Sequence, residues 1–233
     1  MKSRFFIVFI CLLPCLGTLA QPRLAEPEMY VGVHGGALAT IVNWSPQVIG
    51  TRDVLKHALL SGNGGLVFRY SQHKCCGLQV EVNYMQRGWR ENGYDSKNDL
   101  SVAYTRRLDY IEVPFLAHIY FGSPKFRGFV NLGPQVGYCF HESEEGTQHT
   151  IETTQYNPIE HPFDWGVVAG LGFYGRSEKA GLFQLEARFH YSMGHLYDNR
   201  MGAYFDSSNT MSVSLNLAYM LQIRSKHKSN HKQ

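Results

Sequence analysis

The chain has 233 residues, a formal net charge of +3 and a mean hydropathy of -0.25. Beyond residue 20 no apolar run reaches about 18 residues, so the sequence predicts no membrane-spanning helix. Three cysteines remain in that part of the chain (Cys75, Cys76 and Cys139), and their odd number excludes a disulfide scaffold. About 213 residues without a Pro/Gly/Ser-rich linker predict a single domain.

The first 20 residues have the pattern of a secretory signal peptide. Lys2 and Arg4 form a positive region, and residues 5–16 form an apolar stretch too short to span a membrane. Thr18 and Ala20 are small or polar residues at the positions expected before a cleavage site, which predicts cleavage before Gln21. We therefore expect an exported protein.

The rest of the chain alternates between apolar and polar residues in eight segments, which is the signal of half-buried strands. The segments cover residues 28–41, 62–71, 76–88, 107–121, 126–140, 163–175, 182–193 and 209–224. The connectors between them are alternately long and short, the pattern of a membrane β-barrel with short periplasmic turns and longer outer loops. We predict an all-β domain over residues 21–224. It is an eight-stranded antiparallel transmembrane barrel with an up-and-down meander, followed by a basic periplasmic tail over 225–233.

The even number of strands places both termini on one side of the membrane, and the short turns identify that side as the periplasm. The predicted location is the bacterial outer membrane. A soluble lipocalin-like barrel also alternates and is a rival interpretation. The even strand count, the loop asymmetry and the aromatic residues at the segment ends favour the membrane barrel.

Strand parity predicts which side chains face the barrel interior. In the third segment Glu81 and Arg87 share the polar face, and in the seventh Glu186 and Arg188 do so. Charges removed from bulk water need partners, so we expect ion pairs across the lumen. The candidate charge network consists of Arg69, Glu81, Arg87, Glu112, Asp164, Glu186, Arg188 and Arg224. An eight-stranded barrel has an interior that side chains can fill, so we interpret this network as a structural plug.

Four features qualify the simple strand pattern. Pro114 and Pro134 lie inside predicted strands, where we expect local bulges because proline donates no ladder hydrogen bond. Aromatic residues crowd the segment ends and are expected to form interfacial girdles. Glycines of the first and sixth segments are expected to allow close approach across the lumen. Residues 51–60 are predicted to form one short helix within the first long connector.

Four stretches of the sequence resemble strands of one family. They are residues 77–89 (GLQVEVNYMQRGW), 108–121 (LDYIEVPFLAHIYF), 131–138 (NLGPQVGY) and 163–172 (FDWGVVAGLG). They are similar to the PorT family of small porin-like outer-membrane β-barrels. The resemblance implies the barrel fold and a role as an accessory to protein secretion. The nine residues after Arg224 depart from barrels of this type, which usually end near the last strand.

We identified no catalytic, cofactor or metal site in the sequence. His190 and Ser192 are two residues apart on one strand, which resembles the arrangement in outer-membrane lipid A deacylases and suggests a nucleophile and its base. Parity places both side chains inside the barrel, away from a lipid substrate. We therefore expect a non-enzymatic protein with a structural, binding or secretion-accessory role. The alternatives are a lipid-modifying hydrolase using His190 and Ser192, and a narrow passive pore.

The long connectors are the expected binding surface. The connector at 141–162 is rich in glutamate and histidine and could bind a cation or bridge to lipopolysaccharide phosphates. The expected partners are outer-membrane lipids, lipopolysaccharide, and secretion-system or envelope proteins. The basic tail offers a weak nucleic-acid signal, but we expect no nucleic acid because the protein is exported. We expect a monomer, since a closed barrel needs no partner for its edges.

Overall fold

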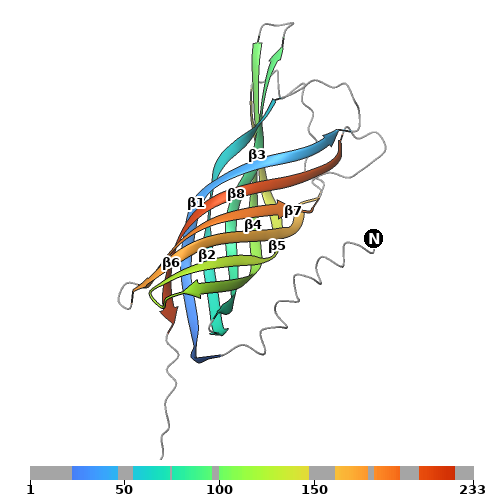
Figure 1. Cartoon of the computed structure of the whole chain (residues 1–233). Helices are drawn as coiled ribbons and strands as arrows, with labels where there is room; N and C mark the ends of the chain where they lie inside the picture. The colour runs from blue at the N-terminus through green and yellow to red at the C-terminus, as the bar shows by residue number, and fades with distance from the viewer. Residues whose placement is uncertain are drawn as a thin grey trace, which may run out of the picture.

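The computed structural model describes residues 23–46, 55–73, 75–95, 100–146, 161–177, 181–194 and 205–223. All secondary structure in these residues is β (Figure 1). The strands are β1 (Arg23–Pro46), β2 (Leu55–His73), β3 (Cys76–Asp95), β4 (Leu100–Gly122), β5 (Phe126–Gly146), β6 (Phe163–Ser177), β7 (Gly181–Ser192) and β8 (Phe205–Ile223). Among the described residues there is no helix long and apolar enough to cross a membrane.

The eight strands form one closed antiparallel barrel in sequence order. Each strand pairs with the next, and β1 closes the barrel on β8, from Met29 opposite Ile223 to Pro46 opposite Phe205. The predicted eight-stranded meander is therefore confirmed. The predicted signal peptide, the tail at 225–233 and Arg224 lie outside the described residues.

The strands extend further into the long connectors than the sequence predicted. The helix expected at 51–60 is wrong for its described part, since β2 begins at Leu55 and pairs with β3 from Leu55 opposite Asn92. Leu59 is buried and the adjacent Leu60 is exposed, which is strand alternation. Residues 141–146, predicted as loop, continue β5 and pair with β4 beyond a register shift between Asp109 and Tyr110. Cross-strand pairing extends these segments even where the apolar alternation fades.

The barrel is uneven at its long-connector end. The β3–β4 hairpin projects beyond the rest and is paired up to Asp95 opposite Leu100 (Figure 1). By contrast, the β6–β7 pairing stops at Gly166 opposite Ser192. Strands β3 to β5 thus form a wall that rises well above β6 and β7.

The two prolines do not cause the expected bulges. The pairing of β5 with β6 is continuous through Pro134 opposite Val167, and the β4–β5 register is the same on both sides of Pro114. The register shift in this part of the sheet lies instead between Asp109 and Tyr110. The prolines are accommodated by missing individual pairs rather than by an extra residue.

The predicted alternation places polar residues inside and apolar residues outside. Leu78, Val82 and Tyr84 of β3 are exposed on the outer face, while Gln79 and Glu81 are buried. The prediction that the aromatic residues at the segment ends form interfacial girdles is only partly confirmed. Five of the aromatic residues expected in it point inward and are buried: Tyr30, Trp89, Tyr110, Tyr120 and Tyr174.

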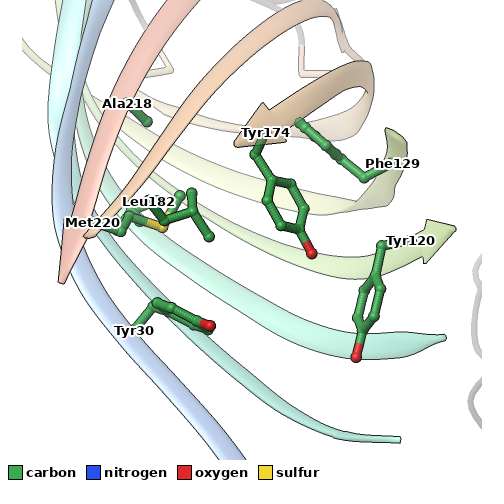
Figure 2. Close-up of a cluster of buried hydrophobic side chains, with 8 residues drawn as sticks. Tyr30, Tyr120, Phe129, Tyr174, Leu182, Ala218 and Met220 are labelled. Carbon is green, nitrogen blue, oxygen red and sulfur yellow. The ribbon is translucent and has the colours of Figure 1, made fainter. Parts of the chain in front are cut away.

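Several of these inward residues form the apolar core at the short-turn end. Figure 2 shows Tyr30, Tyr120, Phe129 and Tyr174 directed into the barrel, with Leu182, Ala218 and Met220 on the neighbouring wall. The rings of Phe129 and Tyr174 lie 5.8 Å apart, and the Tyr120 hydroxyl donates to the His73 carbonyl. Aromatic side chains therefore fill the lumen at this end.

Candidate functional site

The centre of the barrel interior holds a network of buried charges, which is the candidate functional site. Arg188 of β7 reaches across the lumen to β3, where its Nη1 lies 2.6 Å and its Nη2 2.8 Å from the two carboxylate oxygens of Glu81. The same guanidinium donates to Glu186 at 3.1 Å and 2.7 Å. This bidentate geometry is the strong form of an arginine–carboxylate pair. Arg188 thus links two walls that are not adjacent in the sheet.

A second arginine joins this pair to the aromatic core. Arg69 donates to the Gln79 oxygen at 2.8 Å and also to Gln184. Gln184 donates in turn to Glu186 at 2.9 Å. The Arg69 guanidinium carbon lies 5.4 Å from the centre of the Tyr174 ring, within cation–π range. We call these six residues the central network: Arg69, Gln79, Glu81, Gln184, Glu186 and Arg188.

A second group of charges lies closer to the long-connector end. Arg87 pairs with Glu112 and, at 2.8 Å, with Asp164. The Gln135 amide lies beside them: with its nitrogen facing Glu112, its oxygen accepts from Arg87 at 3.0 Å. We call Arg87, Glu112 and Asp164 the outer cluster. Its one positive and two negative charges leave it formally negative.

The structure places seven of the eight predicted network residues inside the barrel, with exposed fractions of 1 to 6 %. They form two groups rather than one, because Arg69, Glu81, Glu186 and Arg188 belong to the central network and the other three to the outer cluster.

Sequence reasoning did not single out two uncharged residues of the interior, His34 and Asn131. His34 Nε2 lies 2.6 Å from the Asn83 oxygen, and Asn83 donates to Glu81 at 2.8 Å. On the opposite side Asn131 donates to Glu186 at 2.8 Å. The strand parity used for the charged residues would also have placed His34 and Asn131 inside.

His190 and Ser192 both face the interior, as parity predicted, and both are buried. The Ser192 hydroxyl donates to Asp164. His190 Nδ1 lies 3.1 Å from the Gln135 amide. Each side chain therefore has a partner in or beside the outer cluster, and both belong to the packed interior.

Three glutamates in the described part of the connector at 141–162, namely Glu142, Glu144 and Glu145, contact arginines. Arg106 Nη2 lies 2.7 Å from Glu142, and Arg106 Nη1 lies 3.3 Å from Glu144. Arg107 pairs with Glu145 at 2.6 Å. Arg106 and Arg107 were missed because they fall on the border of the predicted fourth strand. Within the ranges described, no group of three or more His, Cys, Asp or Glu side chains is arranged to hold a metal ion.

A third ionic group spans the mouth at the short-turn end. Glu28 of β1 accepts from Arg176 of β6 at 2.8 Å, and Arg127 of β5 lies 3.9 Å from the same carboxylate. Arg176 also donates to Gln222 of β8 at 2.8 Å. We call Glu28, Arg127 and Arg176 the mouth cluster. It connects β1 to strands on the far side of the barrel, directly below the aromatic core.

Taken together, these groups bind the walls of the barrel to one another.

A family model described as "Outer membrane protein beta-barrel domain" matches residues 20–198 of the chain. A comparison with curated proteins finds no match.

Among solved structures, the chain is similar to the outer membrane protein OprG from Pseudomonas aeruginosa, with 12% identity and a TM-score of 0.55 over 86% of this chain and 98% of OprG. Outer membrane protein W from E. coli is 13% identical over 86% of this chain and 98% of its own, with a TM-score of 0.40. Ail from Yersinia pestis is 13% identical over 83% and 99% of the two chains, with a TM-score of 0.39. At these identities the likeness to OprG supports the fold alone.

Proposed function

The chain belongs to the family of outer membrane protein β-barrel domains, and from this premise we propose that it is a closed, non-enzymatic barrel of the PorT type. In this proposal the interior is structural, and the wall formed by β3 to β5 contacts envelope or secretion proteins. Both termini lie in the periplasm. The PorT assignment is supported by the resemblance of residues 77–89, 108–121, 131–138 and 163–172 to strands of that family.

The observation that carries the proposal is the filled interior. Arg188 crosses the lumen to Glu81, and Arg87 connects Glu112 with Asp164. The aromatic core lies below these charges and the mouth cluster below the core. An eight-stranded barrel filled in this way leaves no continuous aqueous path. This supports a structural role for the interior rather than conduction.

The orientation is supported by the connectors. The described short turns, between β2 and β3 and between β4 and β5, lie at the same end as the start of β1 and the end of β8. Short turns are periplasmic in outer-membrane barrels. The projecting β3–β4 hairpin is then directed to the outside of the cell.

Planar-bilayer recording tests the closed interior. The wild-type protein is expected to give no measurable current, because the central network blocks the lumen. A variant with Arg188→Ala, Glu81→Ala and Glu186→Ala should also give no measurable current, because the aromatic core and the mouth cluster still fill the short-turn end of the lumen. Steady conductance from the wild type would overturn the proposal.

Affinity capture of the intact membrane protein tests the partner role. Arg107 and Glu145 form an exposed ion pair on the rising wall, and exchanging them (Arg107→Glu with Glu145→Arg) keeps the pair but reverses the surface charges. A partner that recognises this wall should be lost from the exchanged variant while the barrel stays folded. Identical co-purifying proteins from both forms would contradict a binding role for this wall.

A further inference from the structure

A groove of about 470 Å³ lies on the outward face of the barrel near the short-turn end. Two rows of residues that pair across neighbouring strands line it. The first row runs from Gly175 of β6 through Phe183 and Tyr219 to Val33 of β1. The row crosses four strands, a span of about 14 Å at the usual strand spacing.

The second row lies one outward position further along the strands. It runs from Phe173 through Leu185 and Leu217 to Gly35. The outward side chains of both rows are apolar or aromatic. An apolar chain in the groove would therefore contact apolar surface along its whole length.

Glycines open the groove at two opposite corners. A Cβ placed on Gly175 would have no heavy atom within 4 Å, and one on Gly35 would meet only the Asn63 carbonyl at 3.6 Å. Inward glycines of the same strands are crowded; a Cβ on Gly172 would collide with the Leu185 carbonyl. The space beside Gly175 is therefore open volume on the outer surface, and it is not needed for strand packing.

Aromatic pairs form the walls. The rings of Phe126 and Phe173 lie 5.7 Å apart, and those of Phe183 and Tyr219 lie 5.0 Å apart. Such pairs hold their rings in fixed relative positions and favour a defined groove. A flexible apolar chain lying between them would contact ring faces on both sides.

Positive charge lies next to the groove. Lys125 is exposed in the turn directly before Phe126, and its carbonyl accepts from the backbone N–H of Arg176 at 2.9 Å. Arg127 and Arg176 point to the barrel mouth, where Glu28 is the carboxylate that pairs with them. Among the side chains that the structure describes at this end, three cations face one carboxylate, and this excess of positive charge attracts anionic headgroups.

We propose that this groove binds one acyl chain of an anionic phospholipid, with the headgroup phosphate beside Lys125. The leaflet in which the groove lies rests on the proposed function, because short turns in the periplasm place the groove in the inner leaflet of the outer membrane. The class of ligand follows from the local chemistry: an apolar groove in a face that lipid covers, and a cationic turn at its end.

Native mass spectrometry of the delipidated, folded protein in detergent tests the proposal. The probes are phosphatidylglycerol and phosphatidylcholine with identical acyl chains. The wild type should bind one phosphatidylglycerol, and bind phosphatidylcholine about fivefold more weakly, the effect of one cation at a membrane surface. Lys125→Gln should remove that difference. Equal binding of both lipids by the wild type would overturn headgroup recognition.

Filling the groove tests the acyl-chain site. Gly175→Leu and, independently, Gly35→Leu should weaken binding about tenfold, because each removes contact with two or more methylene groups. Ala169→Leu is the matched control: it adds a leucine to the outward face of β6 outside the groove and should bind like the wild type. Unchanged binding by both glycine variants would overturn the site. Since this assay is independent of orientation in the membrane, its failure is distinguishable from failure of the proposed function.

Discussion

Removing the cross-lumen arginine is the sharpest perturbation of the interior. Arg188→Met keeps a side chain of similar length but deletes four charged contacts, two to Glu81 and two to Glu186. In the central network two arginines balance two glutamates, so the variant leaves one uncompensated negative charge among side chains that are almost completely buried.

The expected loss in the free energy of unfolding follows from the contacts that remain. Breaking a buried ion pair by removing one partner costs about 3–5 kcal/mol. Both carboxylates keep amide donors, Asn83 and Gln79 for Glu81 and Asn131 and Gln184 for Glu186. These donors place the expected cost at the lower end of that range, about 3 kcal/mol.

Urea unfolding of the barrel in lipid vesicles, followed by tryptophan fluorescence, measures this cost. A variant that combines Arg188→Met with Glu81→Gln is the control, because it removes the uncompensated negative charge together with the arginine and leaves Arg69 balanced by Glu186. It should recover at least half of the loss. A cost below about 1 kcal/mol for Arg188→Met, or no recovery in the combined variant, would refute the argument that unpaired buried charge determines the cost.

Two further predictions concern the interior. Gly170→Val should lower the free energy of unfolding by about 1–3 kcal/mol, because a Cβ there would displace the Glu186 carboxylate. Gly175→Val is the control on the open outer surface. In the same urea assay it should change the free energy of unfolding by less than about 0.5 kcal/mol. Ser192→Ala should lower the free energy of unfolding by about 1 kcal/mol, because the hydrogen bond to Asp164 is lost. Mass spectrometry of lipid A should find no deacylated species in cells that express either the wild type or this variant. A deacylated species that is present with the wild type and absent with the variant would contradict a purely structural role for Ser192.

The strand pattern was readable from the sequence because a two-residue period separates the two faces of each strand. That period alone places Glu81, Glu186 and Arg188 on the inward face, where the structure has them buried. It could not show which carboxylate each arginine contacts. The Arg188–Glu81 pair joins residues 107 positions apart, and its partners are set by barrel closure and strand stagger.

Sequence reasoning failed mainly at strand ends and for aromatic residues. The outer end of β5 was expected to be loop because residues 141–146 are polar, yet pairing with β4 and the arginines Arg106 and Arg107 keep it extended. Tyr120 and Tyr174 were expected in a girdle, but their parity matches the inward face of their strands. In β5, contacts with neighbouring strands override local composition, whereas the two tyrosines follow the strand parity that the sequence itself contains.

The mouth cluster bears on how long an assembled barrel survives. Glu28 and Arg176 are separated by 148 positions, so their bond closes one of the longest loops in the chain and requires the first and the sixth strand to be in place. We expect such a contact to form after the transition state for assembly, in which case it would slow dissociation of the finished barrel and leave the rate of insertion nearly unchanged. The contribution of the Glu28–Arg176 contact would therefore appear as a longer lifetime of the assembled barrel.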